Sequence, residues 1–321
     1  MDIKNPRSLK TAAKTTLENA RCDANRLLII HIGITLGLSA LLSLLDYAVE
    51  QGIGSSSGLS NLGLRSILET AQTLLRIAHS IALPFWQMGY LFLTLKLARE
   101  ETASASTLLE GFRRFGPIIR YQLLSGLLVT GVIMVGTYVS TGIYLMTPLS
   151  NALVEEMNVL VQNSTEDMAA LEEMLTAVIS KHIWPIVILF SVVCLTIGIP
   201  IYYRYRMADL ALMDHPEKGA IHALRSSRTM MRKNCLKLVK LDLSFWWFYL
   251  LEALVIAVAY TDALLPALGI NLPLHEDVQY FLFYFLSLAC QFGIYWLYKN
   301  YVSVTYAKAY TVLLPQPEEM I

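Results

Sequence analysis

Six apolar stretches of about 20 residues restrict this 321-residue chain to the folds that a membrane allows. A helix of about 20 residues crosses the roughly 30 Å of hydrocarbon in a bilayer. Charged residues make up only 16% of the chain, whereas soluble domains carry about 25%. We predict spans near 27–49, 77–97, 121–146, 183–205, 241–261 and 279–301. The predicted fold class is therefore an all-α integral membrane protein with six transmembrane helices.

The Lys and Arg residues are divided unequally between the two sets of connections. Only Arg65, Arg76 and Lys181 fall in the connections after spans one, three and five, and the other 22 of the 25 fall in the remaining segments. Lys and Arg retain short loops on the cytoplasmic side of a membrane. We therefore expect both termini to lie in the cytoplasm and an acidic, helical, extracytoplasmic connection at 150–182.

A segment with helical periodicity precedes each of the three predicted hairpins. These segments lie near 6–26, 104–120 and 216–240, and each places apolar residues on one side and basic residues on the other. Such helices are expected to lie in the plane of the lipid headgroups. We interpret residues 1–321 as a single membrane domain of three hairpins, each preceded by a cytoplasmic amphipathic helix.

The motifs of catalysis and of metal binding are missing from the sequence. It has no HExxH, GxSxG or GxxxxGK[ST] motif, and its six histidines are scattered. The four cysteines include no CxxC pair, which argues against a zinc site or a disulfide framework. About 26 hydrophilic residues precede the first span, too many for the start of a signal peptide. We expect no enzyme activity, no cofactor and no metal.

Glu252 is the most informative single residue, because it lies in the middle of the fifth predicted span. An ionised acid there costs about 2.5–3.5 kcal/mol on the insertion scale, so it should face protein or water. It could relay a proton or cation, or balance the charge of a bound substrate. Alternatively, it is a hydrogen-bonded residue that ties spans together. The possible partners are His79, Gln87, Ser287 and Gln291.

Two further groups of residues are candidates for binding. Arg76 and His79, one helical turn apart at the outer start of span two, could attract an anion, or Arg76 could extend to the interface and His79 could simply be hydrogen-bonded. Basic residues of the cytoplasmic segments could bind anionic headgroups, at about 1 kcal/mol each, or could serve only to fix the topology. The headgroup candidates are Arg113, Arg114, Arg225, Arg228, Arg232, Lys233, Lys237 and Lys240.

Five stretches after Tyr202 form a recognisable pattern. They are Tyr-Arg-Tyr-Arg-Met-Ala (203–208), Asp214-His215-Pro216, Ser-Ser-Arg-Thr-Met-Met (226–231), 237–245 and 301–310. In these stretches the chain resembles an uncharacterised family of bacterial integral membrane proteins, domain of unknown function 975, whereas the first half resembles the family only in its general layout. The resemblance implies a bacterial multi-pass plasma-membrane protein, and it assigns neither an activity nor functional residues.

Two functional hypotheses follow from these patterns. The first is a non-catalytic module that organises anionic lipid, or a partner protein, through its basic cytoplasmic face. The alternative is a small transporter or channel in which Glu252 lines the pathway; such a protein would need a homo-oligomer to build one. Nucleic acid is not an expected partner, because the basic residues alternate with apolar ones and no recognition fold accompanies them.

Overall fold

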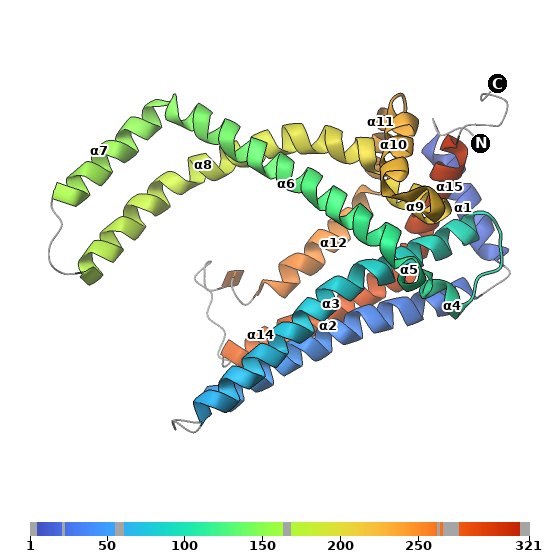
Figure 1. The fold of residues 1–321 in the computed structure, drawn as a ribbon, viewed down its shortest axis with the longest axis horizontal. Helices are drawn as coiled ribbons and strands as arrows, with labels where there is room; N and C mark the ends of the chain where they lie inside the picture. Colours follow the sequence, from blue (N-terminus) through green and yellow to red (C-terminus); the bar gives the residue numbers. More distant parts are fainter. Residues whose placement is uncertain are drawn as a thin grey trace. The chain divides into compact units, whose positions relative to one another are not determined.

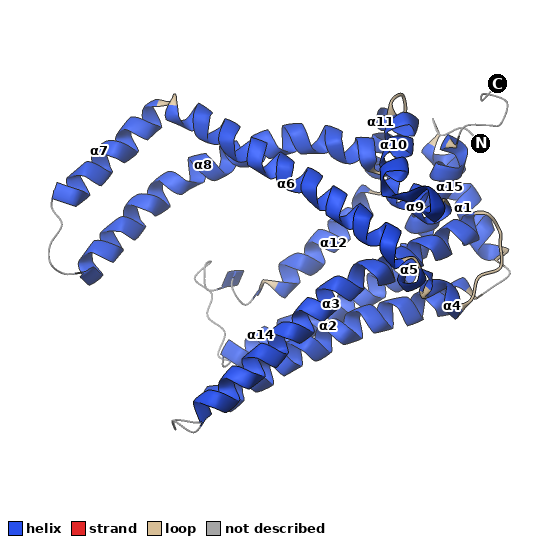
Figure 2. Cartoon of the chain, in the orientation of Figure 1, coloured by secondary structure: helices blue, strands red, loops and turns tan. Residues whose placement is uncertain are grey.

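The computed structural model of the chain describes residues 5–20, 23–54, 61–162, 168–261, 264–265 and 276–314. Within these ranges every regular element is a helix, and no strand is present (Figure 2). The predicted all-α class is thus confirmed. The helices are α1 (Pro6–Glu18), α2 (Ala24–Gly54), α3 (Asn61–Ala98), α4 (Ala105–Leu108), α5 (Glu110–Arg113), α6 (Phe115–Leu145), α7 (Pro148–Gln162), α8 (Met168–Tyr205), α9 (Ala208–Asp214), the 3₁₀ helix η1 (Pro216–Lys218), α10 (Gly219–Met231), α11 (Cys235–Ser244), α12 (Trp246–Ala259), α14 (Glu276–Ile294), the π-helix η2 (Tyr295–Lys299) and α15 (Asn300–Leu313).

Five stretches of helix in the described residues are long and apolar enough to cross a membrane. They are Ala24–Tyr47, Ser66–Ala98, Phe115–Leu145, Met174–Asp214 and Val278–Leu313. The fifth predicted span, 241–261, is not one straight helix, because α11 and α12 meet at an angle of 63°. Counting this bent pair as a span gives six. Five or six apolar helices are compatible with a multi-pass membrane protein.

The three segments predicted as single amphipathic helices are shorter or interrupted. The first helix, α1, ends at Glu18, where the Asn19 N–H bonds the Thr15 carbonyl oxygen, and not at residue 26. The segment 104–120 holds the four-residue helices α4 and α5, and its last residues begin α6. Pro117 is accommodated there because the first turn of a helix needs no N–H from it.

The third segment, 216–240, contains η1, α10 and most of α11. Its break has a local cause: the Asn234 amide donates to the Met230 carbonyl oxygen at 2.7 Å and satisfies the end of α10. The helix resumes at Cys235. A second turn at Phe245, whose N–H bonds the Asp242 carbonyl oxygen at 2.9 Å, separates α11 from α12.

The chain forms two compact units, residues 1–118 with 207–321, and residues 119–206. In the first unit α3 is the central helix; it packs against α2, α4, α5, α9 and α15. Figure 1 shows α2, α3 and α14 running beside one another. Several of the largest fully buried side chains lie in α1, in the last turns of α3, and in α4, α9 and α15. They include Leu9, Leu93, Leu97, Leu108, Leu212 and Tyr310.

The second unit contains most of α6 with α7 and α8. The first of the two helices from the predicted connection 150–182, α7, packs against the start of α8. Glu156 forms an ion pair with Lys181, and a carboxylate oxygen of Glu156 lies 3.3 Å from the His182 Nε2 atom. The hydrogen bond from Lys181 lowers the pKa of Glu156. Residues 163–167 of this connection, including Glu166 and Asp167, lie outside the described residues, and the described part is helical.

Candidate functional site

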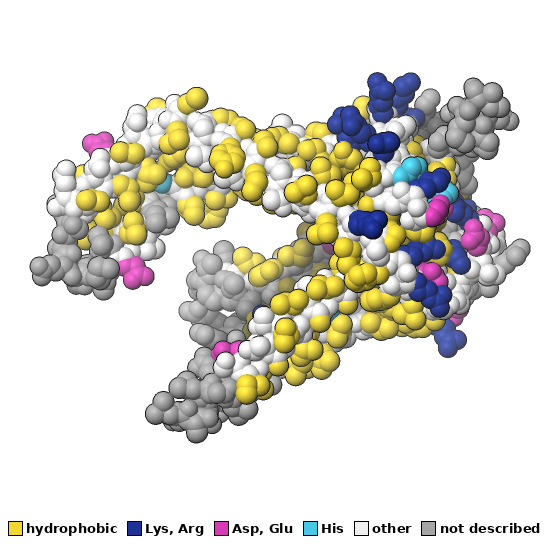
Figure 3. Space-filling model, viewed as in Figure 1, with side chains coloured by type: hydrophobic (Ala, Val, Ile, Leu, Met, Phe, Trp, Pro, Cys, Tyr) yellow, Lys and Arg dark blue, Asp and Glu magenta, His cyan; other side chains and the backbone are white. Residues whose placement is uncertain are grey.

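The basic residues of α10 and α11 lie on an exposed surface. Ser227 on the opposite side of α10 is buried and accepts a hydrogen bond from the Met207 N–H at 3.2 Å, which holds α10 against α9. The basic side chains therefore point away from the core, and Figure 3 shows them gathered over α10 and α11. We call the following exposed residues the basic surface: Arg225, Arg228, Arg232, Lys233 and Lys240.

Large apolar side chains are exposed on the same two helices. Ile221 is 65% exposed, Leu236 is 78% exposed and Leu243 is 65% exposed. A single exposed leucine is ordinary in a soluble protein. Here, however, the exposed apolar residues lie between the residues of the basic surface, on helices that lead directly into the apolar α12. This combination is typical of a helix at a membrane interface.

The three other predicted headgroup residues have contacts within the protein. Lys237 is half-buried and donates to the Asn234 side-chain oxygen at 2.6 Å. Arg113 is exposed and pairs with Glu110 at 2.7 Å. Arg114 is half-buried, donates to the Met213 carbonyl oxygen at 2.5 Å and lies over the Phe92 ring. The Arg114 bond joins the end of α5 to α9, whereas the other two contacts are local. The basic surface is therefore the more accessible group.

An ion pair with a buried carboxylate supports the part of the first unit that carries the basic surface. Both terminal nitrogens of Arg99, at the end of α3, bond the Asp214 carboxylate at 2.7 Å. The Asp214 side chain is 6% exposed and also accepts from the Tyr310 hydroxyl at 3.0 Å. The hydrogen bonds to Asp214 raise the pKa of Arg99. Sequence reasoning missed this pair, which joins α3, α9 and α15.

Arg76 and His79, the predicted anion-attracting pair, have different surroundings. Arg76 is exposed and forms an ion pair with Asp46 of α2, which also accepts from Gln72. His79 is half-buried, and its Nε2 atom has no hydrogen-bond partner among the described residues. Arg76 therefore ties α3 to α2 through a carboxylate that the sequence analysis did not consider.

Glu252 belongs to a polar cluster that lies within the first unit. It is half-buried on α12, which packs against α14, and it interacts electrostatically with Tyr295 and Lys299. Gln291, one of its predicted partners, donates to the Tyr295 hydroxyl at 3.2 Å.

Lys299 is the positive charge of this cluster. Its ammonium nitrogen lies 4.0 Å from the centre of the Tyr295 ring and 5.4 Å from that of the Tyr90 ring. It also interacts electrostatically with Glu252. Tyr295 therefore contacts the Lys299 ammonium group through its ring face and interacts electrostatically with Glu252. Neither Tyr295 nor Lys299 was singled out from the sequence, although Gln291, Tyr295 and Lys299 follow one another at a helical spacing of four.

Aromatic and amide groups extend the cluster to α2 and α3. The Tyr90 hydroxyl donates to Asn300 at 3.1 Å, and Asn300 donates to the Ala24 carbonyl oxygen at the start of α2. The His31 ring stacks on Tyr90 with the ring centres 4.3 Å apart. His31 is 1% exposed, and its Nδ1 atom has no hydrogen-bond partner in the described part of the chain. The residues of the cluster therefore come from six elements: α2, α3, α12, α14, η2 and α15.

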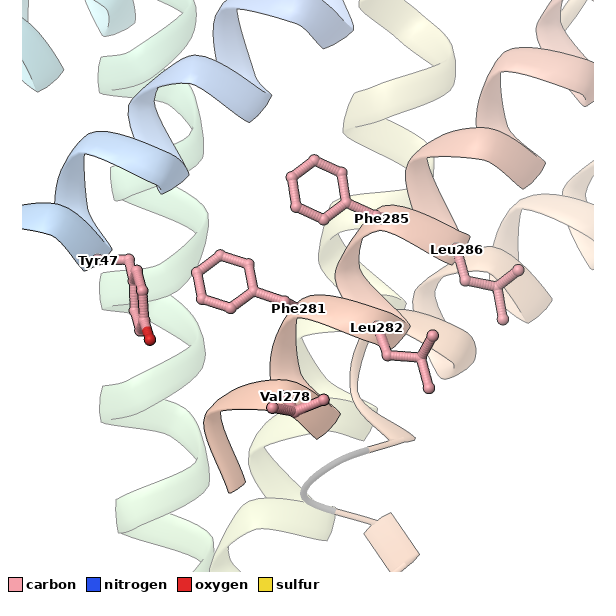
Figure 4. Close-up of a pocket in the computed structure, with 6 residues that line it drawn as sticks. All are labelled: Tyr47, Val278, Phe281, Leu282, Phe285 and Leu286. Atoms are coloured by element: carbon pink, nitrogen blue, oxygen red, sulfur yellow. The ribbon is translucent and has the colours of Figure 1, made fainter. Parts of the chain in front are cut away.

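An apolar groove of about 560 Å³ lies between α2 and α14 (Figure 4). The Tyr47 and Phe281 rings meet edge to face in it, with their centres 4.5 Å apart. Its other lining residues are Val278, Leu282, Phe285 and Leu286. The lining offers a single hydroxyl, so the groove cannot select a ligand by charge or by hydrogen bonding.

Comparisons with known proteins leave the function open but define the family. Among the described residues, no three His, Cys, Asp or Glu side chains are arranged to hold a metal ion. No curated protein and no solved structure matches the chain. One family model, described as "Protein of unknown function (DUF975)", matches residues 1–315 and so includes the first half, where only the general layout had indicated a resemblance. The chain therefore belongs to the DUF975 family.

Proposed function

We propose that this protein is a non-catalytic, six-span module of the bacterial plasma membrane that organises anionic lipids through its basic cytoplasmic surface. The observation that carries the proposal is the combination of exposed basic and exposed apolar side chains on α10 and α11. The apolar side chains enter the headgroup region, and the basic ones then lie beside lipid phosphates. Each basic residue near an anionic surface contributes about 1 kcal/mol, or about fivefold in affinity.

The bend at Phe245 supports the same arrangement. An in-plane helix has to turn sharply before its chain can cross the membrane, and the angle between α11 and α12 is 63°. Trp246 and Trp247 follow the turn, and aromatic residues of this kind favour the level of the headgroups. We therefore place α11 along the cytoplasmic surface and α12 in the bilayer.

Replacing Arg225, Arg228, Arg232 and Lys233 together by glutamine is expected to lower the retention of phosphatidylglycerol more than tenfold. Native mass spectrometry of protein released from micelles that contain phosphatidylglycerol and phosphatidylcholine measures this retention. The matched control changes the three arginines to lysine and Lys233 to arginine; it keeps all four charges and should retain the lipid. Equal phosphatidylglycerol retention by the glutamine variant and the wild type would refute the proposal.

The proposed orientation predicts the activity of two fusions. A reporter enzyme that works only outside the cytoplasm is expected to be active when fused after Glu166, because that connection is acidic and carries few basic residues. The same reporter fused after Lys218 is expected to be silent. Immunoblots must show equal amounts of both fusions. The opposite pattern would place the basic surface on the outer side of the membrane.

A further inference from the structure

The side chains on one face of α3 change in character along the helix. This face carries Leu74, Ile81, Phe85, Phe92 and Lys96, which follow one another at spacings of four or seven residues. Leu74 and Ile81 are exposed, as side chains that contact hydrocarbon are expected to be. Lys96 lies in the last turn of the helix. The face therefore presents first apolar and then cationic side chains, the order in which a phospholipid presents its acyl chains and its phosphate.

Aromatic rings of the segment that follows α3 cover Phe85. The short helix α5 packs against α3, and Figure 1 shows the two side by side. The centre of the Phe85 ring is 4.9 Å from that of Phe115 and 5.8 Å from that of Phe112. Phe112 and Phe115 are themselves exposed, so their rings add apolar surface beside the face of α3. Phe92 lies about 10 Å farther along the helix.

Two cations lie beside the Phe92 ring. The Lys96 ammonium nitrogen is 5.3 Å from the ring centre, and the Arg114 guanidinium carbon is 4.2 Å from it. Glu110 lies 3.7 Å from Arg114 and pairs with Arg113 at 2.7 Å. The Lys96 ammonium group forms no hydrogen bond or ion pair with another described residue. The three cations and the one acid therefore leave an excess of positive charge, next to the apolar surface of α5.

We propose that Lys96 and Arg114 bind the phosphate group of one anionic phospholipid, whose acyl chains extend along α3 toward Ile81. The distance along the helix from Phe92 to Ile81 is about 16 Å, which matches one leaflet of a hydrocarbon core of about 30 Å. This α3 site shares with the proposed function only the location of the chain in a membrane. It does not require the basic surface to bind lipid.

The α3 site differs in kind from the basic surface. The basic surface is exposed on α10 and α11, so it attracts whichever anionic headgroups lie beside it. In the α3 site Arg114 is half-buried and fixed by its bond to the Met213 carbonyl oxygen, and the rings of Phe112 and Phe115 lie beside the acyl chains. The choline group of phosphatidylcholine is positively charged and is repelled by Lys96 and Arg114. The site therefore favours a lipid with a net negative charge, such as phosphatidylglycerol.

A phospholipid that carries a diazirine on one acyl chain tests the proposal. The full-length protein is irradiated in phosphatidylcholine vesicles that contain the diazirine form of either phosphatidylglycerol or phosphatidylcholine. Mass spectrometry then compares the labelling of the peptides around Ile81 and Phe112 with that of the exposed α6 residues Leu123 and Leu127. Relative to α6, the phosphatidylglycerol probe should label these two peptides at least about fivefold more than the phosphatidylcholine probe does, since each basic residue near a phosphate contributes about that factor.

Three variants locate the charges that cause this preference. Lys96→Gln should lower the labelling of the two peptides by the phosphatidylglycerol probe about fivefold, and Lys96→Arg should keep it. The glutamine variant of the basic surface described above should also keep it. Each variant must elute from size-exclusion chromatography as the wild type does. The proposal is wrong if the two probes label these peptides of the wild type equally, if folded Lys96→Gln is labelled as the wild type is, or if the glutamine variant of the basic surface loses the label.

Discussion

Replacing Arg99 by methionine is expected to lower the free energy of unfolding by about 2–4 kcal/mol. Methionine keeps the apolar stem but removes the two bonds to the Asp214 carboxylate, whose side chain is 6% exposed. Removing one partner of a buried ion pair costs about 3–5 kcal/mol, and we lower this range because the Arg99 side chain is 32% exposed. Equilibrium unfolding in mixed micelles of a mild detergent and dodecyl sulfate measures the change.

Two comparisons show whether the buried carboxylate causes this loss. Adding Asp214→Asn to the Arg99→Met variant should recover at least half of the lost stability, since an amide left without its partner costs less than a charge. Arg113→Met removes an ion pair from a guanidinium that is 67% exposed and should cost less than about 1 kcal/mol. Equal losses for Arg99→Met and Arg113→Met would contradict the special role of Asp214.

The same pair shows why the sequence predicts the helices of this protein better than their contacts. Stretches such as 27–49 and 121–146 are apolar throughout, and helices occupy them because every backbone polar group in lipid must be bonded within its own segment. Arg99 and Asp214 are far apart in the sequence and lie outside the predicted spans, and neither has a pattern that indicates the other. The sequence analysis counted Arg99 only among the basic residues that indicate the topology.

Short-range hydrogen bonds explain the breaks that hydropathy does not detect. The span predicted at 241–261 has an unbroken apolar average, yet the turn at Phe245 divides it, and Asn234 divides the helix before it. A hydropathy average over about 20 residues hardly changes when one side chain ends a helix by hydrogen-bonding a carbonyl oxygen. For the polar cluster the sequence did contain a signal, the spacing of Gln291, Tyr295 and Lys299, but recognising it requires knowing that α12 packs against this stripe.

Replacing Gly111 by alanine is expected to destabilise the first unit by more than about 3 kcal/mol, as overpacking of a backbone contact cannot be relieved by a side-chain rotation. A Cβ atom on Gly111 would overlap the Phe85 carbonyl oxygen, and one on Gly89 would overlap the Leu108 carbonyl oxygen. The two glycines thus allow α3 to contact α4 and α5 through backbone atoms.

Gly116→Ala is the matched control, because its Cβ meets no atom within 4 Å; helix propensity predicts a gain of up to about 1 kcal/mol there. Equilibrium unfolding in the same mixed micelles gives the free energy of unfolding of each variant. Equal values for Gly111→Ala and Gly116→Ala would show that this backbone contact does not hold α3 to α4 and α5.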